Sequence, residues 1–169
     1  MVIMTWVNES FMRLALAKAD SARQHGDMPF GAVITSRGKL VVAVENGEGQ
    51  DIDITAHAEL LAIRQACKLL GRRDLSDCEM YASVEPCPMC SSAIFQSNIP
   101  RIAYSLSRDD LPHIFRLRKI RIAQLADDWD YTPEVVGGIL TSEALTAFEG
   151  LEQSHRVVPQ FHSLQHQTA

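Results

Sequence analysis

The chain has 169 residues, of which 46% are hydrophobic and 22% are charged, so it can bury the core of one ordinary domain. No apolar run approaches the length of a membrane-spanning helix, so we expect no membrane partner. Residues 1–6 lack both the basic region and the long apolar stretch of a signal peptide, so we expect a cytoplasmic protein.

The charge is unevenly distributed along the chain. The formal net charge is -5, and residues 122–169 hold seven acidic residues and one basic residue, or 1 - 7 = -6. The first 121 residues hold 15 basic and 14 acidic residues, or +1. Contacts with phosphates dominate the affinity of proteins for nucleic acids, and the acidic segment would repel phosphates. A small-molecule partner is therefore favoured over a nucleic acid.

Hydrophobic periodicity predicts alternating helices and strands. The predicted helices cover 7–24, 55–70 and 88–96, with two more around 111–125 and 142–151. The predicted strands cover 30–35, 40–44, 79–84 and 101–105, with a short one near Val135. The polar run 45–53 is expected to be a loop, and the helix over 55–70 is expected to be mostly buried. This order indicates an α/β layered domain with a mixed sheet. We expect one domain over 1–155 and a tail over 156–169 that is flexible or covers an active site.

Two short segments carry the residues suited to chemistry. They are Thr55-Ala56-His57-Ala58-Glu59 and Glu85-Pro86-Cys87-Pro88-Met89-Cys90, and each opens a predicted helix. The partial positive charge of a helix N-terminus lowers the pKa of a thiol and favours the thiolate that zinc needs. One histidine and two cysteines give three protein ligands and leave an open position for water. An open position is typical of a catalytic zinc site, because structural sites are closed by four protein ligands.

Glu59 follows the histidine by two residues and is well placed to take a proton from such a water. Zinc lowers the pKa of bound water from ~15.7 to roughly 7, so hydroxide is available at neutral pH. The combination of H-x-E with P-C-x-x-C is the signature of zinc nucleobase deaminases.

The chain resembles the cytidine deaminase superfamily, and most closely its branch of guanine deaminases and tRNA adenosine deaminases. The matching segments are 29–34, the region around Asn46, 55–59 and 85–90. The resemblance implies a three-layer α/β/α fold with a mixed five-stranded sheet, a homodimer, and one Zn²⁺ with a catalytic water in each subunit.

The resemblance also implies roles for individual residues. His57, Cys87 and Cys90 would ligate zinc, and Glu59 would shuttle protons. Asn46, Phe30, the backbone of Ala58, and Glu85 would contact the substrate. The implied reaction is attack of zinc-activated water on the ring carbon that bears the amine, with release of ammonia.

Each of these interpretations has a simpler alternative. The two cysteines could be a redox pair, or half of a structural zinc cluster completed by Cys67 and Cys78, although Cys67 has the setting of a core residue. Asn46 precedes a glycine, as in many turns, and Phe30 could be an ordinary core residue. Glu85 could serve only to begin a helix. The basic run 116–121 could clamp RNA or form the solvated face of an amphipathic helix, and we favour the solvated face.

For the substrate, Phe30 and the Cys87–Cys90 segment favour the guanine deaminase side of the branch. We therefore expect deamination of a free nucleobase or related amino-heterocycle, with a guanine-type purine favoured. The alternatives are a tRNA-specific adenosine deaminase and a cytosine or nucleoside deaminase. A scaffold subunit that keeps zinc without chemistry is a further alternative, although such subunits usually lose the residue equivalent to Glu59. Asp109 and Asp110 are additional candidates for substrate contact.

Overall fold

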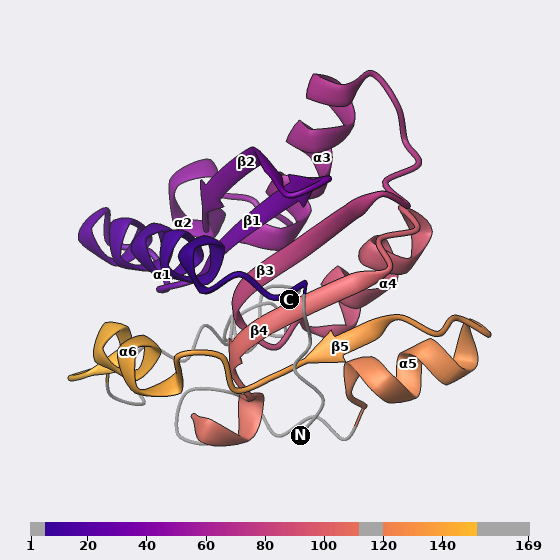
Figure 1. The fold of residues 1–169 in the computed structure, drawn as a ribbon. Helices are drawn as coiled ribbons and strands as arrows, with labels where there is room; N and C mark the ends of the chain where they lie inside the picture. Colours follow the sequence, from indigo (N-terminus) through magenta and orange to yellow (C-terminus); the bar gives the residue numbers. More distant parts are fainter. Residues whose placement is uncertain (1–5, 112–119, 152–169) are drawn as a thin grey trace, which may run out of the picture.

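The computed structural model describes residues 6–111 and 120–151, which form a mixed sheet with helices on both faces (Figure 1). The strands are β1 (Gly31–Ser36), β2 (Lys39–Glu45), β3 (Cys78–Val84), β4 (Arg101–Leu106) and β5 (Glu134–Val136). The helices are α1 (Glu9–Gln24), α2 (Glu48–Asp51), α3 (Ala58–Leu70), α4 (Pro88–Gln96), α5 (Ile122–Asp128) and α6 (Thr141–Leu145), with 3-10 turns η1 (Arg108–Asp110) and η2 (Thr146–Phe148).

The sheet has the strand order β2-β1-β3-β4-β5. β1 is antiparallel to both β2 and β3, whereas β3, β4 and β5 are parallel to one another. A parallel pair needs a crossover connection, and α4 provides it between β3 and β4. All seven residues of the central strand β3 are buried, so both faces of the sheet are covered there. The predicted mixed five-stranded sheet is confirmed.

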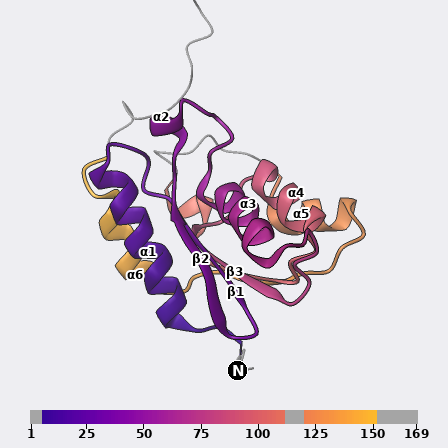
Figure 2. The ribbon, with the colours of Figure 1, turned by 90° about the horizontal axis from the view of Figure 1, so that it is seen from above.

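The helices lie in two layers. Figure 2 shows α1 and α6 on one face of the sheet and α3, α4 and α5 on the other. α1 lies so close to β1 that a Cβ atom on Gly31 would be 2.1 Å from the carbonyl oxygen of Ala15, so only glycine fits there. The buried face of α1 has helical spacing and is made mainly of small side chains, Met12, Ala15, Ala19 and Ala22. The predicted three-layer α/β/α fold is confirmed.

The region before α3 differs from the sequence prediction. The predicted loop 45–53 contains the short helix α2. α3 begins at Ala58, not at residue 55, because His57 has extended backbone angles and is the N-cap. The prediction that this helix is mostly buried was wrong: Leu69 is 66% exposed, and only Ala58, Glu59, Ala62 and Ala66 are buried.

The C-terminal part also differs from the prediction. Leu111 is buried but lies outside any helix, and among the described residues after it the first helix is α5, which begins at Ile122. Residues 112–119, which include most of the basic run, lie outside the described residues, as do 152–169 with the whole predicted tail. The helix predicted over 142–151 is a single turn, α6, followed by η2. In the ranges that the structure describes, no helix is both long and apolar enough to span a membrane.

Candidate metal centre and active site

Three possible zinc donors meet beyond the C-terminal end of β3. His57 Nδ1 lies 3.4 Å from Cys90 Sγ and 3.7 Å from Cys87 Sγ, and the two sulfur atoms are 3.6 Å apart. Ligands on a tetrahedral zinc, at about 2.3 Å for sulfur and about 2.0–2.1 Å for nitrogen, lie roughly 3.6–3.8 Å from one another. Both the donor types and their spacing therefore fit zinc, with three protein ligands and a fourth position for water.

The local sequence explains this convergence. His57 is the N-cap of α3, and Cys87 is the N-cap of α4. Pro88 occupies the first turn of α4, where a missing N–H costs no helical hydrogen bond. Cys90 lies one turn further along, so its thiol returns to the same side as Cys87. The backbone N–H of Cys90, in the first turn of α4, donates to Cys87, and the partial positive charge of the helix N-terminus favours the thiolate form of Cys87.

The electrostatics of the three donors are strongly coupled. The hydrogen bond between Cys90 and Cys87 lowers the pKa of Cys87 to about 3. His57 acts in the same direction, whereas burial opposes the shift. The same pairing raises the pKa of Cys90. Burial tends to lower the pKa of His57, but hydrogen bonds to Cys87 and Glu48 outweigh it and raise that pKa to about 10. The lowered pKa of Cys87 favours the thiolate form that zinc binds, and binding of zinc would release protons from donors that still carry them.

Glu59 lies in the first turn of α3 and is 8% exposed. Burial raises the pKa of its carboxyl, and the negative charge of Cys87 acts in the same direction. A buried carboxyl whose pKa is raised holds a proton more readily than an exposed one, which suits a general acid and base.

Asn46, at the end of β2, is fully buried. Its amide nitrogen donates to Asp27 Oδ1 over 2.8 Å and to Glu48 Oε2 over 3.3 Å. Ionised carboxylates only accept hydrogen bonds, so these two partners fix which way the amide points. Its oxygen Oδ1 is buried without a hydrogen-bond partner among the described residues. A ligand with a hydrogen-bond donor would satisfy this oxygen.

The other two residues expected beside the ring lie nearby. Ala58 is fully buried as the first residue of α3, directly between His57 and Glu59. Phe30 is half-buried, its carbonyl accepts from the backbone N–H of Asn46, and its ring packs 6.1 Å from that of Phe148. The ring of Phe30 therefore packs in the core, and its backbone binds the segment that carries Asn46.

Glu85 is 5% exposed and is engaged by basic residues. Its Oε2 accepts from Arg121 over 3.2 Å and from the backbone N–H of Arg108 over 3.4 Å. Arg121 also pairs with Asp109, whereas Asp110 accepts from the backbone N–H of Ser107 and caps η1. We expected Arg121 either to be solvated or to clamp RNA. It instead forms ion pairs within the protein, and the rest of the basic run lies outside the described residues.

The four-cysteine zinc cluster is not formed. In the described ranges, the group that could hold a metal consists of His57, Cys87 and Cys90, with ligand atoms within 4.8 Å of one another. Cys67 is half-buried in the middle of α3 and packs against the core. Cys78 is at the opposite end of β3 from the zinc donors.

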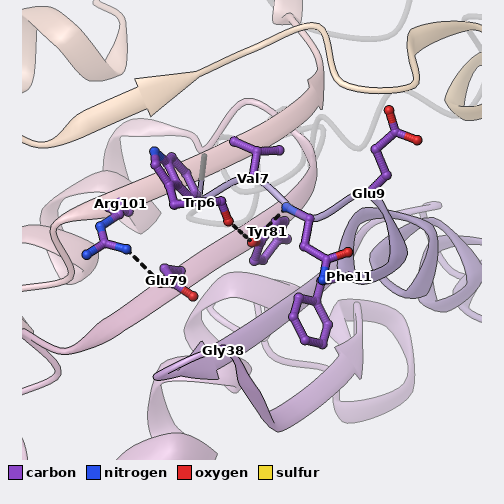
Figure 3. A pocket seen from close by; sticks show the side chains of 9 residues that line it. Trp6, Val7, Glu9, Phe11, Gly38, Glu79, Tyr81 and Arg101 are labelled. Carbon is purple, nitrogen blue, oxygen red and sulfur yellow. Dashed lines mark hydrogen bonds and ion pairs between the residues drawn. The ribbon is translucent and has the colours of Figure 1, made fainter. Parts of the chain in front are cut away.

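A separate groove of about 570 Å³ lies at that opposite end of the sheet. Its lining includes the aromatic residues Trp6 and Tyr81 and the ion pair between Glu79 and Arg101 (Figure 3). Tyr81 donates to the backbone carbonyl of Trp6 and accepts from the backbone N–H of Asn8. These contacts attach the start of α1 to the sheet.

Sequence reasoning missed Asp27, Glu48 and the internal pairing of Arg121. Asp27 and Glu48 lie in polar segments on either side of β1 and β2, where acidic residues are usually solvated. Glu48 lies two residues from Asn46 along the chain, but Asp27 lies 19 residues away, so no signal in the sequence indicated its contact. Their roles depend on the hairpin bringing the two segments together.

Comparison of the sequence with known proteins finds deaminases. The family model for the cytidine and deoxycytidylate deaminase zinc-binding region matches residues 5–106. A tRNA-specific adenosine deaminase of Aquifex aeolicus is 33% identical over 80% of this chain and 91% of its own length. A guanine deaminase of Bacillus subtilis is 40% identical over 61% of this chain and 67% of its own length.

A solved structure of guanine deaminase from Nitrosomonas europaea superposes with a TM-score of 0.75 at 26% identity, covering 83% of this chain and 82% of that one. The family match covers both zinc-donor motifs and more than half of the 169 residues. The chain therefore belongs to the zinc-dependent cytidine and deoxycytidylate deaminase family.

Proposed function

We propose that this protein hydrolytically deaminates a free nucleobase or a related amino-heterocycle, with a guanine-type purine favoured. The observation that carries the proposal is the buried carboxyl of Glu59 beside the three donors His57, Cys87 and Cys90. This arrangement suits hydrolysis, because a metal site with an open position and an adjacent proton carrier can activate water.

In this proposal, zinc bound by the three donors supplies Lewis acidity, which makes its water a nucleophile at neutral pH. Glu59 takes the proton of that water as the water oxygen bonds to the ring carbon that bears the amino group. Glu59 would pass this proton to a ring nitrogen, and would then take the remaining proton of the added hydroxyl group and give it to the departing amine. The C–N bond breaks, the carbon becomes a carbonyl, and the nitrogen leaves as ammonia.

The substrate would be held by Asn46, Phe30, the backbone N–H of Ala58, and Glu85. Asn46 supplies the most specific support, because its two carboxylate partners leave only the buried Oδ1 to meet a ligand. An unsatisfied buried acceptor costs about 1–3 kcal/mol, which a donor on the substrate would recover. A free base carries a ring N–H that a nucleoside lacks at its glycosylated nitrogen. Glu85 would reach the ring only with a carboxylate that Arg121 already engages.

The negative charge of the C-terminal segment favours a free nucleobase or related heterocycle over a nucleic acid. Residues 122–169 carry a formal charge of -6, and Arg121 at the edge of this segment is neutralised by Glu85 and Asp109. A polyanion would gain little attraction from this region.

A second candidate is a tRNA-specific adenosine deaminase. It is favoured by the Aquifex relative, which matches this chain over 91% of its own length. The same donors and the same Glu59 would serve that reaction. A cytosine or nucleoside deaminase would use them as well, so the substrate assay must include all of these classes.

The test is ammonia release by the zinc-loaded protein. The compounds assayed are guanine, adenine, cytosine, aminated triazines, cytidine, adenosine and a tRNA, with Glu59→Gln as the inactive control. Release from a free base or triazine, with none from tRNA, is the expected result. Release from tRNA alone would overturn the small-ring proposal and establish the second candidate. Release from no compound would contradict an active deaminase and favour the scaffold alternative.

We further propose that the protein acts in the cytoplasm as a homodimer. Ile52 and Ile54, in the loop before α3, are 93% and 75% exposed, and Leu69 lies exposed on α3 itself. Large apolar side chains at such exposure are suited to burial against a second subunit. Sedimentation equilibrium of the protein is expected to give twice the monomer mass, and a monomer at micromolar concentration would contradict this.

A further inference from the structure

The imidazole of His57 has two nitrogen atoms with different surroundings. Nδ1 faces the sulfur atoms of Cys87 and Cys90. Nε2, on the other side of the ring, lies 3.6 Å from Oε2 of Glu48. The side chain of Glu48 is only 21% exposed, although charged side chains are rarely covered without a partner.

The second nitrogen matters for metal binding. A neutral imidazole that binds a metal through Nδ1 carries its proton on Nε2. A carboxylate beside Nε2 accepts that proton in a hydrogen bond, which selects this tautomer and fixes the plane of the ring. Glu48 is positioned to do this for His57.

Glu48 has a second partner in the substrate region. The same oxygen, Oε2, accepts from the side-chain nitrogen of Asn46 over 3.3 Å. One carboxylate therefore contacts both a zinc donor and the residue that would bind the ring. A shift of Glu48 would alter both at once.

The backbone around Glu48 is held from several sides. Gly47 donates its N–H to the carbonyl of Ala56 over 2.9 Å, directly before His57. Gly49 donates to Asp27 Oδ2 over 2.9 Å, and Asp27 is also the second acceptor for Asn46. The carbonyl of Glu48 accepts from the N–H of Asp53, which closes the turn of α2. Glu48 is thus presented by a fixed turn, as a positioning residue must be.

We propose that Glu48 is a positioning residue that orients His57 for zinc and couples the metal centre to Asn46. It lies outside both sequence motifs, on the short helix α2 that was expected to be a loop. The proposal rests on His57 as a zinc ligand and on no particular substrate.

The test measures zinc affinity, so it needs no turnover. The dissociation constant for Zn²⁺ is determined by competition with a chromophoric chelator at constant pH, for the wild type, Glu48→Ala and Glu48→Gln. Loss of an outer partner of a metal ligand typically costs 10–100-fold in affinity. We expect roughly that loss for Glu48→Ala and a smaller loss for Glu48→Gln, because glutamine keeps an oxygen that can accept from Nε2.

The matched control is Asp51→Asn. Asp51 is an exposed acidic residue on the same helix, so this change removes the same charge without touching His57 or Asn46. We expect its affinity for zinc to stay within about twofold of wild type. The visible spectrum of the Co²⁺-substituted protein gives a second readout, and it should change in Glu48→Ala and not in Asp51→Asn.

Wild-type zinc affinity in Glu48→Ala would overturn the proposal, as would an equal loss in Asp51→Asn, which would indicate a general charge effect. Circular dichroism of the metal-free variants checks folding, and if Glu48→Ala is unfolded, the comparison of Glu48→Gln with Asp51→Asn decides. Unchanged zinc binding by His57→Ala would instead show that the ligand assignment itself is wrong.

Discussion

The two ends of the central strands β3 and β4 both carry buried polar side chains, but they use them differently. At the N-terminal end, Glu79 accepts from Thr35 over 2.5 Å and from Arg101 over 2.8 Å. Every one of these groups finds a partner of complementary chemistry inside the protein. At the C-terminal end, one imidazole and two thiols face one another within 4.8 Å.

This difference separates a structural cluster from a functional one. Opposite charges and matched donors and acceptors stabilise a fold without any ligand. Three metal donors gathered at one point, beside a buried carboxyl, form a site that a cation would complete. At the zinc end the buried Oδ1 of Asn46 also lacks a partner among the described residues, whereas Glu79 and Arg101, beside the groove of Figure 3, are paired within the protein.

The largest effect is expected from removing a zinc donor. His57→Ala and Cys87→Ala should each lose bound zinc and with it all ammonia release, because two remaining ligands cannot hold the metal in a catalytic geometry. Zinc content per chain, measured by elemental analysis, checks this. The matched control is Cys67→Ala, a cysteine outside the donor group, which should keep one zinc per chain.

The next effect concerns the proton carrier. Glu59→Gln should keep zinc and lower turnover by roughly 10²–10⁴-fold, the usual contribution of a general acid and base. Zinc analysis and ammonia release on the same sample separate the two properties. Ammonia release at the wild-type rate by this variant would show that another group moves the proton.

A smaller effect, on the stability of the fold alone, is expected from a change at the N-terminal end of β3. Glu79→Ala removes the acceptor of the buried Thr35 hydroxyl and the partner of Arg101. An unsatisfied buried polar group should lower the free energy of unfolding by about 1–3 kcal/mol. Urea denaturation measures this change, whereas zinc content and turnover in buffer should stay at wild-type values. A loss of zinc would mean that the two ends are coupled.

The smallest effect involves the response to acid. Hydrogen bonding to Arg72 lowers the pKa of Asp77 to about 2 from an ordinary 3.8, with a further contribution from Ser36. Because the pKa is lowered in the folded state, Asp77 stabilises the protein above pH 3.8, and this contribution is lost as the pH falls through about 2. Asp77→Asn should therefore be slightly less stable than wild type at neutral pH and indistinguishable from it at the lowest pH. Acid titration followed by circular dichroism tests this, and a constant difference at all pH values would contradict it.

Local patterns in the sequence predicted most of the fold. The helix predicted over 88–96 matches α4 at both ends, because Pro88 suits the first turn of a helix and Pro100 limits where it can end. The order of helices and strands predicted the layered α/β sheet. The limits appeared where tertiary packing outweighs periodicity: Leu69 has core chemistry but lies on an exposed face of α3, and residue 55 was assigned to a helix that His57 caps two residues later.

For the site, the sequence by itself determined the donor set and its chemistry, because His57, Glu59, Cys87 and Cys90 lie in two short motifs whose spacing is local. Only the tertiary structure showed that Glu48 and Asp27 hold Asn46 and that Arg121 neutralises Glu85. These pairs join residues from separate elements, such as Asp27 after α1 and Asn46 after β2. The physical reason is that a side chain's partner depends on which segments the sheet brings together, whereas the identity of a metal donor is a property of the residue itself.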